Sequence, residues 1–383
     1  MSNYLGRKAE LMDAAAKATG LSDFGEDDYS EGLELFLHGL DTETTLSPRG
    51  EAMTMGQVQM FLESRLYSEA GWKRYPESLN HPIKAPLIIT GIVRSGTTAL
   101  HRLMSIDPQF QGLEHWLAWA PQPRPPRDQW HSIPAYRKVK GVLDTMIAGS
   151  PQMLDDHMMS AEGVEESMFL LPQTFCNNTF AAQWTLPTYD SWYRRQDETP
   201  SYARLARNFQ LIGAFEPEKR WLLKNPADAR AMDAVLNVHP DALIVQTHRD
   251  PIQSIPSVVD LIASARRLFE NEHSPAEAVA RRELTFWAEA MQNAAAARRR
   301  TQKPGFDLEF TDFVRDQLGA VKSIYAHFDL ELTPEVERGM QTWLDSHPRK
   351  STTMQRFTPE DFGVRRTEMR ALYADYRAAR GYK

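Results

Sequence analysis

The sequence predicts an α/β fold in which a P-loop-like parallel sheet is flanked by helices. Short apolar runs at residues 87–90, 220–224 and 242–247 each end in polar residues or glycine, as strands do at the functional edge of a sheet. Residues 227–239 separate the last two runs by the length of one helix, a spacing typical of a right-handed βαβ unit with parallel strands. Residues 306–310 are a candidate for one more strand.

The chain is expected to have two parts. Residues 1–80 carry helical patterning and are interpreted as a helical N-terminal extension that packs on the core. Residues 81–383 are interpreted as one α/β domain with a mostly helical C-terminal part. Ser274 and Thr333 each precede a proline, which predicts two helix starts.

Composition restricts the class of protein. The chain has 383 residues, of which 42% are hydrophobic and 25% charged, so it can bury a sizeable core. The net charge of -7 argues against nucleic acid or an anionic membrane as the main partner. The lone Cys176 cannot form an intrachain disulfide, which suits the reducing cytoplasm. No signal peptide and no apolar run near the ~20 residues of a membrane span are recognised, so a cytoplasmic protein is expected.

The most informative motif is GIVRSGTT at residues 91–98. It follows the pattern G-x-x-x-x-G-K-[ST], in which backbone N–H groups surround phosphate oxygens and the lysine reaches the β- and γ-phosphates. Thr97 occupies the position of that lysine, Arg94 supplies a cation inside the loop, and Thr98 keeps the hydroxyl. Such a loop before a helix suits a 5′-phosphate without a γ-phosphate. The alternative is an ordinary corner between a strand and a helix.

Two further strand ends supply polar groups to the same edge of the sheet. Lys224 ends the second apolar run, where it either contacts a ligand or extends into water. Arg249 leaves the third run and Ser257 follows on the next helix, a spacing suited to clamping a second phosphate. The alternative for Arg249 is a local ion pair with Asp250.

Three segments together resemble the sulfotransferase superfamily that uses 3′-phosphoadenosine 5′-phosphosulfate (PAPS): Arg94-Ser95-Gly96-Thr97-Thr98, Lys224-Asn225-Pro226, and Arg249-Asp250-Pro251 with Ser257. The chain is most similar to the bacterial branch with a helical N-terminal extension. The resemblance covers essentially the whole chain, and it implies that residues 81–383 form the sulfotransferase domain.

The resemblance also implies where the donor binds. The 5′-phosphosulfate would be held by the loop residues Arg94, Ser95, Gly96, Thr97 and Thr98. The 3′-phosphate would be held by Arg249 and Ser257, and the segment around Arg349 and Lys350 is a looser match to the basic segment that covers it. Lys224 would contact the bridging oxygen of the departing nucleotide.

Candidates for the general base follow from the same resemblance. Related families place a glutamate about twenty residues after the loop arginine, which implies Glu114 here. Other branches use a histidine shortly after the lysine of the second strand, but this chain has Asp228 there. Glu114 is therefore favoured as catalytic residue, with His115 as its neighbour and Asp228 as a weaker candidate.

No metal is expected, because a sulfuryl group carries less charge than a phosphoryl group and cationic side chains suffice. Glu162, Glu165 and Glu166 are interpreted as helical carboxylates, and no His or Cys accompanies them at a spacing typical of metal ligands.

The sequence therefore predicts transfer of a sulfuryl group from PAPS to a hydroxyl of a small organic acceptor. Aromatic residues between positions 116 and 193 favour an apolar acceptor, although most of them are expected in the core. One alternative is a P-loop-type nucleotide kinase, against which Thr97 and the lack of an obvious magnesium-binding acid count. Another is a non-catalytic nucleotide-binding protein. The identity of the acceptor and the oligomeric state, a homo-oligomer included, stay open.

Overall fold

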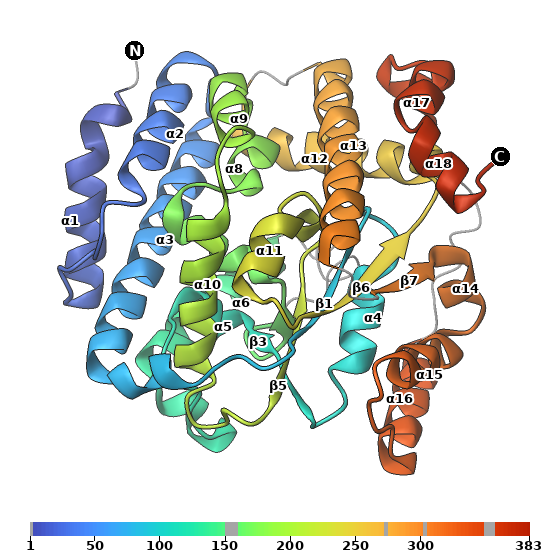
Figure 1. Cartoon of the computed structure of the whole chain (residues 1–383). Helices are drawn as coiled ribbons and strands as arrows, with labels where there is room; N and C mark the ends of the chain where they lie inside the picture. The colour runs from blue at the N-terminus through green and yellow to red at the C-terminus, as the bar shows by residue number, and fades with distance from the viewer. Residues whose placement is uncertain (1–2, 150–159, 272–274, 302–304, 348–356) are drawn as a thin grey trace. The chain divides into compact units, whose positions relative to one another are not determined.

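The computed structural model describes residues 3–149, 160–271, 275–301, 305–347 and 357–383. The chain divides into two compact units. Unit 1 comprises Met1–Ile83, Gln111–Ala181 and Leu186–Arg220, and unit 2 comprises Lys84–Phe110, Ala182–Thr185 and Trp221–Lys383. Figure 1 shows the elements of both units along the chain.

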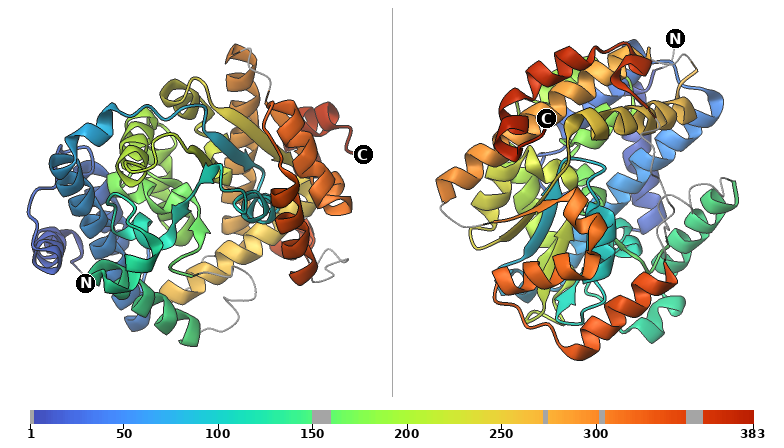
Figure 2. Two further views of the ribbon diagram at one scale, coloured as in Figure 1. Left: turned by 90° about the horizontal axis from the view of Figure 1, so that it is seen from below. Right: turned by 90° about the vertical axis from the view of Figure 1, so that its right-hand side faces the viewer.

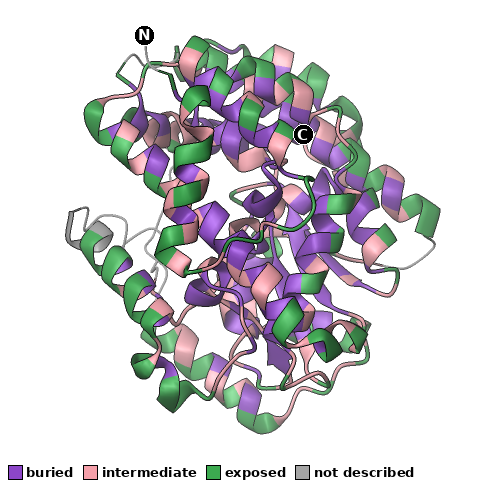
Figure 3. Cartoon of the chain, turned by 90° about the vertical axis from the view of Figure 1, so that its left-hand side faces the viewer, coloured by how far each residue is buried: buried purple, intermediate pink, exposed green. Residues whose placement is uncertain are grey.

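Unit 1 is predominantly helical. Its longer helices are α1 (Lys8–Thr19), α2 (Ser30–Thr42), α3 (Pro48–Arg74), α6 (Pro134–Gly149) and α10 (Thr199–Ile212). The helices predicted within residues 1–80 are therefore present. In α2, the buried residues Leu33, Phe36, Leu37 and Leu40 follow the spacing of one helix face, and Figure 3 shows buried and exposed residues on different sides of these helices.

A buried arginine connects several segments of unit 1. Arg65, in the middle of α3, is 0% exposed and donates hydrogen bonds to the carbonyl oxygens of Phe24 (2.6 Å) and Gln173 (3.1 Å). Its guanidinium lies 4.3 Å from the ring centroid of Tyr29 and pairs with Asp28. A buried guanidinium needs this number of partners, since an unpaired charge would be costly.

The shorter elements of unit 1 carry an aromatic core. They are η1 (Leu5–Arg7), η2 (Pro76–Asn80), β3 (Leu113–Glu114), α5 (His115–Trp119), η3 (Arg127–Ser132), β4 (Val164–Glu165), η4 (Ser167–Phe169), η5 (Leu171–Thr174) and α9 (Pro187–Tyr193). Trp116 is fully buried, and its ring centroid lies 5.6 Å from Trp130 and 5.8 Å from Tyr136. These aromatic residues are core, as expected for most of the set.

Unit 2 is built on a parallel sheet. Its strands are β1 (Leu87–Gly91), β5 (Arg220–Lys224), β6 (Leu243–His248) and β7 (Phe306–Glu309), and the full sheet has the order β2-β5-β1-β6-β7 with β2 (Phe110–Gln111) at one edge. β1 pairs in parallel with β5 and β6, and β6 pairs in parallel with β7. The predicted α/β class and strands are confirmed. The order adds that β1 lies between β5 and β6, so these two strands are not neighbours.

Helices follow each strand of unit 2. They are α4 (Thr97–Met104), η6 (Pro226–Ala229), α11 (Met232–Val238), α12 (Pro251–Phe269), α13 (Ala276–Thr301), α14 (Phe310–Arg315), α15 (Gln317–His327), α16 (Pro334–Ser346), η7 (Pro359–Phe362), α17 (Arg366–Leu372) and α18 (Ala374–Arg380), and α8 (Asn178–Gln183) lies where the two units meet along the chain. The predicted start of α16 is confirmed, since the Thr333 hydroxyl accepts from Val336 N–H ahead of Pro334. Ser274 lies outside the described residues.

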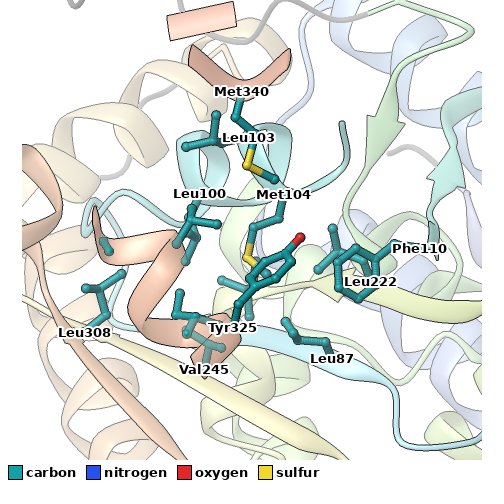
Figure 4. Close-up of a cluster of buried hydrophobic side chains, with 14 of the residues drawn as sticks. Leu87, Leu100, Leu103, Met104, Phe110, Leu222, Val245, Leu308, Tyr325 and Met340 are labelled. Atoms are coloured by element: carbon teal, nitrogen blue, oxygen red, sulfur yellow. The ribbon is translucent and has the colours of Figure 1, made fainter. Parts of the chain in front are cut away.

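The two faces of the sheet differ in chemistry. Leu87, Leu222 and Val245 belong to an apolar cluster that also includes Leu103 and Met340, from α4 and α16 (Figure 4). Side chains alternate along a strand, so the neighbouring positions face the other way. On that side Arg298 of α13 donates to Gln246 Oε1 (2.7 Å) and to Asp307 Oδ1 (2.5 Å).

Gly91 is required where β1 ends. Its φ is +132°, and a Cβ at this position would lie 2.2 Å from the backbone oxygen of Thr247. Both observations exclude a side chain: the backbone region is one that only glycine adopts easily, and the neighbouring atom is part of the paired strand. The close approach of β1 and β6 depends on this residue.

We expect Gly91→Ala to lower the free energy of unfolding by about 3 kcal/mol, because it adds backbone strain and overpacking at one position. Gly56→Ala is the control, since Gly56 is an exposed position of α3 with nothing within 4 Å of the added Cβ. That substitution should raise the stability by about 0.5–1 kcal/mol. Urea unfolding measures both changes, and an unaffected Gly91→Ala protein would contradict the required role of Gly91.

Candidate functional site

The loop between β1 and α4 has the backbone of an anion-binding turn. Arg94 (φ +62°) and Gly96 (φ +89°) are left-handed, and they lie within a segment that leads directly into α4. Alternation of right- and left-handed residues is typical of loops that direct consecutive N–H groups toward an anion. The N-terminus of α4 favours negative charge at the same place.

Ser95 connects this loop to the sheet. Its hydroxyl is 1% exposed, donates to the carbonyl of Ile92, and lies 2.6 Å from Thr247 Oγ1 on β6. The Thr247 hydroxyl in turn donates to the carbonyl of Thr90 (3.2 Å). The Ser95 side chain thus maintains the shape of the loop.

A lysine from the neighbouring strand reaches the end of the loop. Lys224, the last residue of β5, is 1% exposed, and its Nζ donates to Thr98 Oγ1 at 3.0 Å. Burial, and then repulsion by Lys224, lower the pKa of His101 on α4 to about 3. His101 is therefore neutral near pH 7 and adds no second charge beside the lysine. Lys224 of β5 thus supplies an ammonium group to a loop that has no lysine of its own.

Arg249 reaches the same loop from β6. Its Nη1 donates to the carbonyl of Arg94 (2.8 Å), and its guanidinium lies 4.3 Å from the ring centroid of Phe310. A cavity of about 420 Å³ opens at this point, and Arg249, Phe310 and Gln253 are among its lining residues. Ser257 lies on α12 at intermediate exposure. The structure therefore brings Arg249 to the loop.

Asp228 lies just after β5, in η6. It is 3% exposed, and its Oδ1 accepts a hydrogen bond from Asn225 Nδ2 at 2.7 Å. The Asn225 side chain also accepts from Ala227 N–H, which caps η6. The carboxylate of Asp228 therefore closes the turn that follows Lys224.

Glu114 lies in unit 1 and is bound to an arginine that the sequence analysis missed. Arg124 Nε is 3.0 Å from both carboxylate oxygens of Glu114. The same guanidinium donates to Gln111 Oε1 (2.9 Å) and to Glu216 Oε2 (3.4 Å). One feature of the sequence could have indicated this contact. Arg124 is the single charged residue of the proline-rich stretch at 121–126, and such a stretch forms no helix whose solvated face would explain a charge.

His115 lies beside Glu114 in a buried environment. Its ring is 0% exposed, and within the described part of the chain neither nitrogen has a hydrogen-bond partner. Glu165 Oε1 lies 3.7 Å from His115 Nδ1. Glu165 was expected on a helix, but residues 164–165 form β4, which pairs with β3 in the register Glu114↔Val164. That expectation was wrong, because a strand of two residues has no periodicity that a sequence can reveal.

A family model described as "Sulfotransferase family" matches residues 86–334, well over half of the chain. The chain belongs to the sulfotransferase family.

Solved structures agree with this assignment of the family. Sulfotransferase STF1 from Mycobacterium tuberculosis H37Rv is 35% identical, with a TM-score of 0.86 over 98% of this chain and 100% of that one. Sulfotransferase STF9 from Mycobacterium avium is 26% identical, with a TM-score of 0.85 over 97% of this chain and 96% of that one. The predicted resemblance to bacterial sulfotransferases is thereby confirmed.

A curated relative adds a named reaction. The omega-hydroxy-beta-dihydromenaquinone-9 sulfotransferases Stf3 of Mycobacterium tuberculosis and Mycobacterium bovis are 21% identical to this sulfotransferase over 255 residues. The match covers 64% of this chain and 63% of the relatives, so the chain spans less than two thirds of their length.

Three remaining expectations concern parts or ligands of this sulfotransferase. Arg349 and Lys350 lie outside the described residues. Among the residues that the structure does describe, no group of three or more His, Cys, Asp or Glu side chains is placed to hold a metal ion. Within the same ranges, no helix combines the length and the apolar character needed to cross a membrane.

Proposed function

We propose that this chain transfers the sulfuryl group of PAPS to a hydroxyl of a small apolar acceptor by in-line displacement. The observation that carries the proposal is the contact between Lys224 Nζ and Thr98 Oγ1 at 3.0 Å. It supplies an ammonium group to a loop whose own sequence lacks the lysine of nucleoside triphosphate enzymes. A donor with a 5′-phosphate and no γ-phosphate suits such a loop.

The donor would lie along the ends of β1 and β6. The backbone of residues 94–98 and the start of α4 would hold the 5′-phosphosulfate. Arg249 and Ser257 would hold the 3′-phosphate. The cavity of about 420 Å³ beside Arg249 and Phe310 offers space for the nucleoside that joins the two groups.

The reaction would need no metal ion. The acceptor oxygen attacks sulfur, the bond from sulfur to the bridging phosphate oxygen breaks, and the hydroxyl proton passes to a base. Negative charge then grows on the 5′-phosphate, where Lys224, Arg94 and the N-terminus of α4 can stabilise it. We expect turnover to continue in the presence of a chelator, since these groups perform the task of Mg²⁺ in phosphoryl transfer.

Glu114 is the proposed general base. Arg124 Nε contacts both oxygens of its carboxylate, and a carboxylate has lone pairs beyond those that face one guanidinium nitrogen. His115 and Asp228 are the alternatives, and both are buried. The Asp228 carboxylate already receives the Asn225 amide, which leaves Glu114 as the favoured residue.

An apolar acceptor with an accessible hydroxyl is the proposed substrate class. The printed name of the Stf3 relatives describes a sulfotransferase acting on an omega-hydroxy-beta-dihydromenaquinone, which is a hydroxylated apolar molecule. The aromatic residues of unit 1 are consistent with such a substrate, although Trp116, Trp130 and Tyr136 are buried against one another.

Ligand-dependent thermal stability tests the donor. We expect 3′-phosphoadenosine 5′-phosphate to raise the melting temperature and ATP to leave it unchanged, because the loop lacks the γ-phosphate lysine. Turnover of PAPS with phenols, steroids and long-chain alcohols is then measured. Stabilisation by ATP alone would favour the nucleotide kinase, and stabilisation by the bisphosphate without any turnover would favour a non-catalytic nucleotide-binding protein.

We expect Lys224→Ala to lower kcat by about 100-fold, because one buried charge-assisted contact to the departing phosphate is lost. Lys219→Ala is the matched control, since Lys219 precedes the same strand and pairs with Glu216 at a half-exposed position. Steady-state kinetics with the bisphosphate affinity measured in parallel separates chemistry from binding. Unchanged turnover in Lys224→Ala would remove this residue from the mechanism.

Glu114→Gln should lower kcat by about 100-fold or more while bisphosphate binding persists, because the amide keeps the shape and loses the base. Glu216→Gln is the control, as it removes the other carboxylate that Arg124 contacts. It should retain nearly normal turnover. Full activity of Glu114→Gln, combined with inactivity of His115→Asn or Asp228→Asn, would transfer the role of base to that residue.

A further inference from the structure

The C-terminal helix α18 contacts the residues on either side of Arg249. The Tyr376 hydroxyl lies 2.9 Å from Nδ1 of His248, the residue before Arg249. Arg377, the next residue of the helix, pairs with Asp250. Figure 1 shows α18 beside the ends of β6 and β7, and α17, which precedes it, contacts α12 (Figure 2).

These contacts form a directed chain of hydrogen bonds. His248 Nε2 lies 3.0 Å from Asp307 Oδ1, and a carboxylate there can only accept, so the proton of the neutral imidazole is assigned to Nε2. His248 Nδ1 is then an acceptor, and Tyr376 donates its hydroxyl proton to it. The His248 ring is thereby held from both sides, by Asp307 of β7 and by Tyr376 of α18.

The remaining partners make this arrangement rigid. His248 and Arg377 are 3% and 6% exposed. Burial lowers the pKa of His248, although the hydrogen bond with Asp307 acts in the opposite direction. The lowered pKa keeps the ring neutral, as this chain of hydrogen bonds requires. Arg298 and Arg380 both contact Asp307. Asp250, besides pairing with Arg377, accepts from Ile252 N–H and caps α12.

We propose that α18 positions Arg249 to read the 3′-phosphate of the donor, with Tyr376 and Arg377 as the positioning residues. The inference rests on the proposed function. The guanidinium of Arg249 is itself held between the Arg94 carbonyl and the Phe310 ring. Because α18 also holds the neighbouring residues His248 and Asp250, the direction of Arg249 is set before ligand binding, and such pre-organisation reduces the entropy that binding costs.

The test compares two nucleotides that differ only at the 3′ position. Calorimetric affinities for adenosine 3′,5′-bisphosphate and adenosine 5′-monophosphate are measured for the full-length protein and for Tyr376→Phe, which removes one oxygen atom. We expect the preference for the bisphosphate to fall about tenfold and the monophosphate affinity to stay unchanged. In kinetics, KM for PAPS should rise while KM for the acceptor stays constant.

A second pair of variants guards against misfolding. Arg377→Ala should reduce the same preference, and Arg377→Lys should restore part of it by keeping a cation beside Asp250. Arg370→Ala, at an exposed position of α17, is the control and should retain the wild-type preference.

The outcomes distinguish this inference from the proposed function. A wild-type protein that binds both nucleotides equally would overturn the proposed function and the inference with it. A wild-type preference that Tyr376→Phe retains in full would overturn the inference alone. Equal weakening of both nucleotides would also overturn it, because that result indicates a general structural role.

Discussion

The register of β1 between β5 and β6 decides which side chains reach the loop at residues 91–98. Ile89 is paired with Lys224, and Gly91 is paired with Thr247. Because side chains alternate along a strand, a slip of β5 by one residue would direct Lys224 to the opposite face of the sheet. The same register places the Thr247 hydroxyl 2.6 Å from the Ser95 hydroxyl. One pairing pattern thus controls both the charge and the shape of the loop.

The cations around this loop come from separate segments of the chain, in contrast to a loop that carries its own lysine. Arg94 lies within the loop, Lys224 ends β5, and Arg249 follows β6. The ammonium of Lys224 is buried and donates to the Thr98 hydroxyl, which is an uncharged group. An anionic ligand would interact with such a cation more strongly than water does, because the surroundings are of low dielectric constant. This distribution allows the charge to be placed along a ligand with two separate phosphate groups.

The strands could be predicted from the sequence because each is a short apolar run that ends in polar residues or glycine. That pattern is recognisable in a single sequence. β5 and the start of α16 were predicted to the residue. The strand order could not be predicted. The residues between β5 and β6 in the sequence predict one helix, but they do not indicate that β1 lies between these two strands in the sheet. β4 has two residues and no periodicity. The contact of Arg124 with Glu114 and that of Ser95 with Thr247 were also missed, because pairs that depend on tertiary structure leave no local spacing.

Arg94 illustrates how the chemistry of a loop outweighs a local conformational preference. A left-handed backbone costs a non-glycine residue about 1–2 kcal/mol, and glycine would remove that cost at position 94. Glycine would also remove the cation. The hydrogen bond from Arg249 to the Arg94 carbonyl has a charged donor, and bonds of this kind contribute about 1.5–3 kcal/mol. This hydrogen bond is therefore strong enough to offset the strain of the left-handed backbone at Arg94. The two arginines therefore depend on each other: Arg249 stabilises the backbone that presents Arg94, and the carbonyl of Arg94 orients the guanidinium of Arg249.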